Sequence, residues 1–349
     1  MNKIPAILPS LLLPWYDAHK RELPWRTDRE PYHIWISEIM LQQTRVEAVK
    51  GYYAKFLDAL PDVAALAQCD DELLHKLWEG LGYYSRVRNL KKAAILIMEQ
   101  YGGKFPETPG EILKLPGIGA YTAGAICSIA YGLPTPAVDG NVLRVCARLL
   151  NDPSPIDQPE TKRAVTQALS EIYPEKAGEF TQALMELGAT LCGPNRAPDC
   201  EHCPCQKICL AFREDTAETL PVKSPRKGKR QEDRTVFIFR CDGCYALEKR
   251  PGKGLLAGLW QFPNVAGTLD TAQALEAAEA MGLQPREILR EVERKHIFTH
   301  IQWIMKGVYL EVSEAAGDFH WFTAEEINTQ AALPTAFRQF WDLEEKEHV

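Results

Sequence analysis

The segment LPGIGAYTAGAI, residues 115–126, decides how the first part of this sequence folds. Gly117 and Gly119 are one residue apart, and glycine permits a turn whose backbone N–H groups point outward at the start of the next helix. Such N–H groups bind anions, phosphate included. By itself the pattern is only moderately specific, because a plain turn between two helices can carry the same residues.

Helical periodicity continues on both sides of this turn. Apolar residues recur at helical spacing from Leu90 to Tyr101, from Val142 to Leu149 and from Phe180 to Leu191. Breaks rich in proline, glycine and aspartate separate these segments, and no strand-like alternation of any length occurs among them. We therefore predict an all-α domain over residues 1–213.

The composition is that of an ordinary globular protein. The chain has 349 residues, 46% of them hydrophobic and 25% charged, a length that suggests roughly two domains. The net charge of the whole chain, −7, argues against a nucleic-acid partner. Phosphate binding, however, needs only a local basic face. No apolar run reaches the length of a membrane span, and prolines interrupt the apolar N-terminus. We expect a cytoplasmic, bacterial-type location.

Four cysteines are spaced C-x7-C-x2-C-x5-C at the end of the last predicted helix: Cys192, Cys200, Cys203 and Cys209. Cys205 lies beside them. In a reducing compartment clustered thiols more often hold metal than form disulfides. Zinc usually takes two C-x2-C pairs, and only one is present here. The asymmetric loop favours one [4Fe–4S] cluster, with zinc as the alternative.

Two carboxyl groups suggest glycosidic-bond chemistry. Glu38 lies among apolar residues of a predicted helix, where a carboxyl tends to keep its proton. Asp139 directly precedes a helix, where a capping carboxylate tends to stay ionised. One raised and one depressed pKa is the division that breaking a glycosidic bond requires. The alternative to a catalytic role is that Glu38 is a partly buried glutamate with a polar partner and that Asp139 only caps its helix.

The second part of the chain differs in composition and periodicity. Residues 214–234 are predicted as a basic linker, because the stretch from Thr219 to Arg234 has six lysines and arginines and almost no apolar residues. Such a linker either only connects the domains or also contacts DNA. Beyond it the periodicity changes, and short runs rich in apolar residues predict strands at 236–239, 245–249, 259–262, 303–312 and 319–322. Helices are predicted near 271–281 and 324–330. We predict an α+β domain over residues 235–349.

Longer motifs carry a family resemblance. WISEIMLQQTRV (35–46), GLGYYSRVRNL (80–90), LPGIGAYTAGAI and VDGNVLRV (138–145) resemble, nearly residue for residue, motifs of the MutY family in the endonuclease III superfamily. The resemblance implies an all-α helix–hairpin–helix glycosylase domain with a [4Fe–4S] loop, followed by an α+β Nudix-like domain. Pro116, Gly117, Ile118 and Gly119 would then hold a DNA phosphate, in the family often through a bound structural cation. The cysteine loop has one residue more than the family's C-x6-C-x2-C-x5-C.

The same resemblance implies roles for individual residues. Glu38 would be the general acid and Asp139 the stabiliser of the sugar cation, with Tyr121 and Asn141 as supporting catalytic residues. Lyase-active relatives have a lysine where this chain has Tyr121, so we expect a monofunctional enzyme. Because the target base must leave the stacked duplex, further residues would surround the extruded adenine: Trp25, Arg26, Leu41 and Gln182. Gln43 and Tyr83 would enter the duplex near the opposite base.

The C-terminal half resembles the Nudix fold without its metal site. Aligned on Gly282, the Nudix box lacks its arginine and its full set of carboxylates, so we do not expect metal-dependent hydrolysis. The family's Phe-Ser-His loop corresponds to Phe298-Thr299-His300, which would read 8-oxoguanine opposite adenine.

The expected function is removal of adenine from A:8-oxoG or A:G mispairs in double-stranded DNA by a monomer. The alternatives are another mismatch glycosylase, such as one acting on thymine, a non-catalytic cluster-containing DNA-binding protein, and a Nudix hydrolase.

Overall fold

The computed structural model describes residues 3–194, 197–225 and 228–347. Its internal contacts divide the chain into two compact units. The helical unit contains Met1–Gln68 and Arg88–Arg226, and the sheet unit contains Cys69–Val87 and Lys227–Val349. Arg226 and Lys227 of the predicted linker lie outside the described residues.

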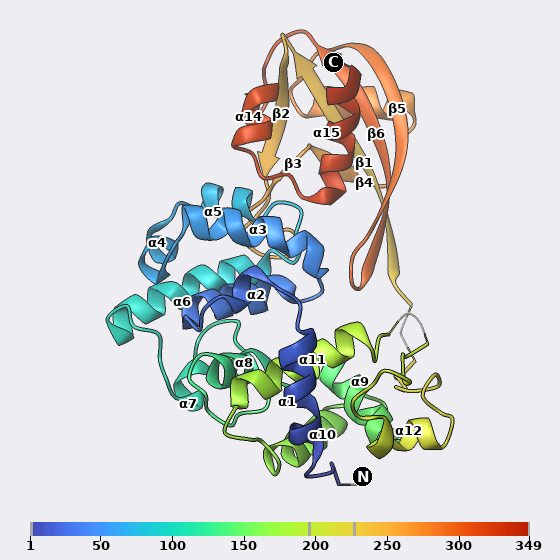
Figure 1. Ribbon diagram of the computed structural model, residues 1–349. Coiled ribbons are helices and arrows are strands. Elements are labelled where there is room, and N and C mark those ends of the chain that lie inside the picture. The colour runs from blue at the N-terminus through green and yellow to red at the C-terminus, as the bar shows by residue number, and fades with distance from the viewer. Residues whose placement is uncertain (1–2, 195–196, 226–227, 348–349) are drawn as a thin grey trace. The chain divides into compact units, whose positions relative to one another are not determined.

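The described residues of the helical unit form helices and loops without strands, as predicted (Figure 1). The first helices are α1 (Leu8–His19), α2 (Pro31–Leu41), α3 (Val46–Ala59), α4 (Val63–Gln68) and α6 (Ser85–Tyr101), whose first turn belongs to the sheet unit. Then follow α7 (Pro109–Ile112), α8 (Ala120–Ile129), α9 (Gly140–Leu149), α10 (Pro159–Ser170), α11 (Ala177–Thr190) and α12 (Leu210–Arg213). Short 3-10 turns lie at Pro24–Arg26 and Gln206–Ile208. No helix in the described ranges is long and apolar enough to cross a membrane.

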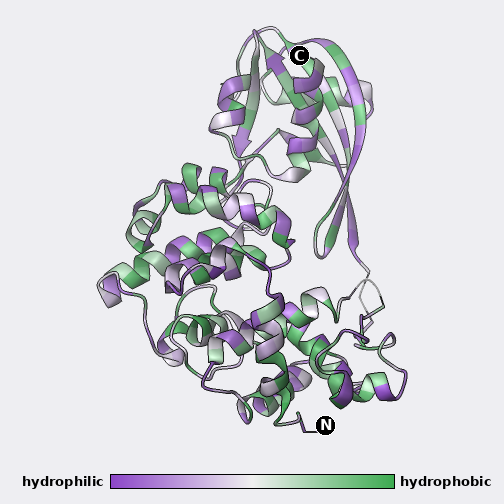
Figure 2. Ribbon diagram, viewed as in Figure 1, coloured by the Kyte–Doolittle hydropathy of each residue, from purple (hydrophilic) through white to green (hydrophobic). Residues whose placement is uncertain are grey.

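Helix α8 lies at the centre of this unit. Its residues from Thr122 to Ile129 are all buried, and it packs against α2 and α11. The ribbon of α8 is coloured mostly as hydrophobic in Figure 2. Gly124 permits a close approach, because a Cβ at that position would lie 2.2 Å from the carbonyl oxygen of Pro136. The segment that leads into Asp139 is thereby held against α8.

Helices α9 and α11 meet in a second close approach. A Cβ at Gly188 on α11 would lie 2.6 Å from the Cβ of Asn141 on α9. A larger residue at position 188 would therefore displace Asn141. The α9–α11 contact belongs to a core that also includes α1 and Cys205.

The sheet unit is built on a mixed sheet. Within the described residues its strands are β1 (Arg230–Cys241), β2 (Cys244–Lys249), β3 (Trp260–Gln261), β4 (Asn264–Ala266), β5 (Pro285–Ile297), β6 (Ile301–Val312) and β7 (His320–Thr323). The strand order is β3-β2-β1-β6-β5, while β4 pairs with β1 and β7 with β2. β1 and β6 run parallel, from Arg230 opposite Ile301 to Arg240 opposite Glu311, and the other pairs are antiparallel.

Helices cover both faces of this sheet. Val236 and Ile238 of β1 pack in one core with α15 (Thr335–Glu347) and α14 (Ala324–Thr329). Phe237 and Phe239 pack in the other core with α13 (Thr271–Ala280). Because successive strand residues point to opposite faces, the run at 236–239 is apolar at every position. The predicted α+β architecture is confirmed.

The structure changes three details of the predicted organisation. Residues 69–87 were predicted within a continuous domain 1–213 but belong to the sheet unit, because helix α5 (Asp71–Leu77) bonds to its strands and loops. The end of the predicted linker 214–234 is already strand β1, which pairs with β6 from Arg230 onward. Its beginning lies on the helical unit, where the Ile156 N–H donates to the Val222 carbonyl (3.0 Å).

Strand β5 and helix α15 were not predicted. β5 is hydrophilic along most of its length (Figure 2) and lies at the edge of the sheet, where its residues alternate between exposed and half-buried. An edge strand of this kind has no apolar run to identify it.

Candidate active site

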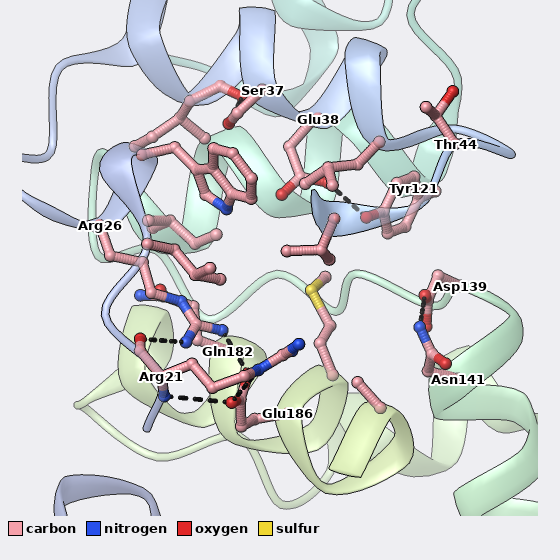
Figure 3. Close-up of a pocket in the computed structure, with 18 residues that line it drawn as sticks. Arg21, Arg26, Ser37, Glu38, Thr44, Tyr121, Asp139, Asn141, Gln182 and Glu186 are labelled. Carbon is pink, nitrogen blue, oxygen red and sulfur yellow. Dashed lines mark hydrogen bonds and ion pairs between the residues drawn. The ribbon is translucent and has the colours of Figure 1, made fainter. Parts of the chain in front are cut away.

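A cavity of about 180 Å³ opens in the helical unit between α2, α11 and the segment before α9. Figure 3 shows the side chains that line it. They include eight residues singled out from the sequence: Trp25, Arg26, Glu38, Leu41, Tyr121, Asp139, Asn141 and Gln182. Residues separated by as many as 157 positions along the chain, Trp25 to Gln182, therefore share one cavity.

Glu38 enters the cavity from the buried helix α2. Only 5% of its surface is exposed. The Tyr121 hydroxyl donates a hydrogen bond to Glu38 Oε2, and Figure 3 shows the two side chains pointing toward each other. The pKa of Glu38 is raised from 4.5 to about 7, mainly by burial and also by the nearby Asp139, and the Tyr121 hydrogen bond and Arg26 offset this rise only in part. A substantial fraction of this carboxyl is thus protonated near neutral pH.

Asp139 faces the same cavity from the N-terminus of α9. Its Oδ1 accepts from the Val142 N–H (2.8 Å) and its Oδ2 from Asn141 Nδ2 (2.7 Å). Asn141 is held in turn by Arg144, whose Nη2 donates to Asn141 Oδ1 (2.9 Å). Asn141 and Arg144 thus fix the orientation of the Asp139 carboxyl.

The expected depression of the Asp139 pKa is wrong. Burial raises the pKa of Asp139 above its ordinary value of 3.8, and the capping bonds from Val142 and Asn141 offset this effect only in part. The sequence showed the cap but gave no measure of how deeply the carboxyl is buried. The two carboxyls still differ, because Glu38 lacks the two donors that hold Asp139.

A buried ion-pair cluster forms another wall of the cavity. The Glu186 side chain is fully buried. It accepts from Arg21 Nε (2.6 Å) and Nη2 (3.0 Å) and from Arg26 Nη2 (2.7 Å). Burial acts to raise the pKa of Glu186, but hydrogen bonds from the two arginines outweigh it and the pKa is lowered. Glu186 stays charged and fixes both guanidinium groups.

Arg21 and Glu186 were not predicted as site residues. They lie 165 positions apart, and neither belongs to a quoted motif. The one available signal was the spacing of Glu186 four residues after Gln182 on α11, which places both on the same helix face. Gln182 is held by the Tyr16 hydroxyl, which donates to its Oε1 (3.1 Å).

The predicted hairpin lies between α7 and α8. Gly117 has φ +79°, and a Cβ there would meet the Cβ of Asn89 at 2.6 Å, so both conformation and space require glycine. The Ile118 N–H closes the turn on the Leu115 carbonyl (3.1 Å). Gly119 is the N-cap of α8, and the first N–H groups of a helix have no partner within it. The hairpin thus directs a helix N-terminus outward, as an anion site requires.

The four predicted cysteine ligands line one small cavity: Cys192, Cys200, Cys203 and Cys209. Arg148 Nη1 donates to Cys192 Sγ (3.2 Å). Cys205 does not line this cavity in the residues described, but is buried in the core of the helical unit with 3% exposed. No three His, Cys, Asp or Glu side chains of the described chain converge as ligands of a single metal ion.

Gln43 lies outside the first cavity. It lines an adjoining groove of about 960 Å³ together with Tyr121 and Asp139. Four basic residues also line this groove: Arg144, Arg148, Lys162 and Lys223. The φ of Gln43, +60°, is unusual for a residue other than glycine.

The remaining predicted residues lie in the sheet unit. Thr299 and His300 are exposed in the turn between β5 and β6. The Phe298 ring packs edge-on against Trp303, with 4.8 Å between ring centroids. Tyr83 is 46% exposed and accepts a hydrogen bond from Thr299 Oγ1 (3.4 Å). The alignment of the Nudix box on Gly282 leaves two of its carboxylates, Glu276 and Glu279 on α13, and both are exposed.

Comparison with known proteins identifies the family. The profile described as HhH-GPD superfamily base excision DNA repair protein matches residues 36–175, and that of the NUDIX domain matches residues 235–343. Human adenine DNA glycosylase is 35% identical over 399 residues, covering 94% of this chain and 72% of the human protein. The mouse adenine DNA glycosylase is 34% identical, covering 96% and 77%. The chain belongs to the adenine DNA glycosylase family.

This glycosylase also resembles solved structures over its helical part. A thermostable thymine-DNA glycosylase has a TM-score of 0.55 and 30% identity, covering 60% of this chain and 96% of its own. A trapped endonuclease III–DNA covalent intermediate has a TM-score of 0.52 and 22% identity, which shows a shared fold. The MutY-type resemblance is confirmed, and the protein is a hydrolase of N-glycosyl bonds in DNA.

Proposed function

We propose that this glycosylase removes adenine paired with 8-oxoguanine or guanine in double-stranded DNA, as a monofunctional monomer. The observation that carries the proposal is the placement of Glu38 and Asp139 around one cavity, with the pKa of Glu38 raised to about 7. The adenine glycosylase relatives cover 94–96% of the chain, whereas the thymine-DNA glycosylase structure covers 60%. This difference favours adenine over thymine as the target.

The reaction follows from the carboxyl pair. A flipped adenine entering the cavity would receive the Glu38 proton at N7, so that the electrons of the glycosidic bond pass to the departing base. The Asp139 carboxylate would stabilise the cation left on the sugar, either electrostatically or by a transient bond to C1′. Water then supplies the hydroxyl at C1′, and its proton is released. The products are adenine and an abasic site.

The cavity walls suit a flat, polar base. Trp25 supplies an aromatic face. Arg26, fixed by Glu186, and Gln182, fixed by Tyr16, supply hydrogen-bonding groups that are held in place before the base arrives. Such preorganisation lowers the cost of orienting the substrate.

Tyr121 supports the monofunctional assignment. Strand cleavage by a lyase needs an amine nucleophile at the sugar. The described residues that line the cavity include no lysine, and the Tyr121 hydroxyl is engaged with Glu38. Burial holds the pKa of Tyr121 well above its ordinary value, so the hydroxyl stays a proton donor toward Glu38.

We further propose that Cys192, Cys200, Cys203 and Cys209 ligate a [4Fe–4S] cluster. Each iron of such a cube takes one thiolate, and the four thiols stand around one cavity rather than in two C-x2-C pairs. When bound, the cluster would fasten the loop after α11. Arg148 would donate to the Cys192 thiolate and keep that ligand in place.

A panel of duplexes tests the substrate. Single-turnover assays on A:8-oxoG, A:G, T:G and A:T, each with and without hot alkali, separate base removal from strand cleavage. We expect abasic product from A:8-oxoG and A:G, revealed only after alkali. Excision from T:G but not from A:G would overturn the proposed substrate, and cleavage without alkali would overturn the monofunctional assignment.

A further inference from the structure

Residues 69–87 lie between α4 and α6 in sequence but belong to the sheet unit. They form α5 and a tight turn that carries Tyr83. The reason for this placement is a set of polar bonds along one face of α5, which position the segment on the strands and loops of the sheet unit.

Glu72 makes the central pair of these bonds. Its Oε2 accepts from Trp260 Nε1 (2.9 Å), and its Oε1 accepts from Lys249 Nζ. Trp260 is 8% exposed, so its indole N–H needs a partner and obtains one from Glu72. Lys249 also lies 5.5 Å from the centre of the Trp260 ring. One carboxylate thereby joins α5 to strands β2 and β3.

Lys76 on α5 and Glu79 in the turn after it make further bonds to the sheet unit. Lys76 Nζ donates to the Ile327 carbonyl (3.3 Å) and to the Ala331 carbonyl (3.2 Å). Glu79 Oε1 accepts from the Leu333 N–H (3.0 Å). Glu72 and Lys76 are four residues apart, which brings their side chains onto one side of α5. Glu79 lies in the turn directly after the helix.

The turn after α5 transmits this placement to Tyr83. Trp78 Nε1 donates to the Gly82 carbonyl (3.1 Å), and Arg86 Nη2 donates to the Leu81 and Gly82 carbonyls (3.1 Å each). Tyr83 has φ +48°, a conformation that persists only where the surrounding structure enforces it. The turn is therefore stiff, and the position of Tyr83 follows that of α5.

Tyr83 and Thr299 form one exposed surface. The Thr299 hydroxyl donates to the Tyr83 hydroxyl (3.4 Å), and both residues are exposed. An aromatic ring can stack on a purine, and a hydroxyl beside it can hydrogen-bond the purine edge. Neither group alone offers both contacts.

We infer that Glu72 is a positioning residue for lesion recognition: by fastening α5 to Trp260 and Lys249, it holds Tyr83 beside Thr299 so that the two contact the base opposite adenine together. The inference rests on the proposed function, in which this unit reads 8-oxoguanine. Glu72 lies outside the excision cavity, so its loss should lower the preference for 8-oxoguanine and leave the excision step intact.

The experiment measures the ratio of single-turnover excision rates for A:8-oxoG and A:G with the full-length protein. Glu72→Leu removes both bonds and should lower the ratio roughly tenfold, with A:G excision within about twofold of wild type. Glu72→Gln keeps an acceptor for the indole and should fall between. Leu73→Ala, which changes an exposed residue of the same helix, is the matched control and should keep the ratio.

A second variant guards against a general loss of folding. Trp260→Phe keeps an aromatic ring, although a smaller one, and removes the indole N–H, so it should lower the ratio as well. Combining it with Glu72→Leu should add little. Amide hydrogen exchange at residues 78–84 should accelerate in both variants. A ratio within twofold of wild type in Glu72→Leu would overturn the inference alone. A wild-type protein with equal rates on both duplexes would overturn it together with the proposed lesion preference.

Discussion

Replacing Glu38 with glutamine should stabilise the helical unit at alkaline pH. The pKa of Glu38 rises from 4.5 to about 7 on folding, mainly through burial. One pKa unit corresponds to about 1.4 kcal/mol, so the ionised carboxylate costs the folded state at most about 3 kcal/mol. Glutamine has nearly the same shape, remains neutral and can still accept the Tyr121 hydrogen bond.

The sign of the effect sets the pH window. Between pH 4.5 and about 7 the folded state binds the Glu38 proton more tightly than the unfolded state, so the wild-type free energy of unfolding falls as pH rises. Above pH 7 the full cost is present. The difference between Glu38→Gln and wild type should therefore be near zero at pH 4.5 and reach about 1–3 kcal/mol at pH 8.

Urea denaturation, with amide hydrogen exchange of α2 as the probe of unfolding, measures the difference in unfolding free energy between Glu38→Gln and wild type within the unit that contains Glu38. Glu99→Gln on the exposed face of α6 is the control and should show no such pH-dependent gain. Parallel curves for Glu38→Gln and wild type from pH 5 to pH 8 would refute the burial argument.

Three further predictions follow from the site. Because Glu38 acts as an acid, the single-turnover rate should fall as pH rises through about 7. Tyr121→Phe removes a hydrogen bond that lowers the Glu38 pKa, so it should shift this fall to higher pH. An unshifted pH–rate profile would contradict the role of that bond. Glu186→Gln should lower the free energy of unfolding by about 3 kcal/mol. This value is the low end of the range for buried ion pairs, because Arg21, one of the two arginine partners of Glu186, is partly exposed. A change below 1 kcal/mol in denaturant titrations would argue against the ion pair. Cys203→Ser should lose iron whereas Cys205→Ser should retain it, since only Cys203 lines the cysteine cavity; iron analysis that gives the reverse order would reassign the ligands.

Local sequence was sufficient to predict the fold class and to single out much of the candidate site. Neighbouring residues in the chain were enough to single out Glu38, which lies within an apolar helix, and Asp139, which directly precedes a helix. The same holds for the glycines of the hairpin, since φ +79° at Gly117 excludes most other residues. The apolar run at 236–239 predicted a strand, and the structure shows that this strand is buried on both faces.

What could not be predicted depends on contacts between distant residues. Glu186 is recognisable as part of the site only when its partner Arg21, 165 positions away, is seen beside it. Residues 69–87 read as one more helix of the first domain, because nothing local shows that Glu72 meets Trp260. The raised pKa of Asp139 likewise depends on burial, which the capping pattern does not contain.

The central claim is that Glu38 and Asp139 carry out adenine release in this cavity. Asp139→Asn and Glu38→Gln each preserve side-chain shape while removing a carboxyl function, so the DNA surface is left in place. Single-turnover excision on an A:8-oxoG duplex, measured beside the dissociation constant for the same duplex, tests the claim most directly. The account predicts that both variants lose at least about 100-fold in rate and bind within a few-fold of wild type. Near-normal excision by either variant would contradict it.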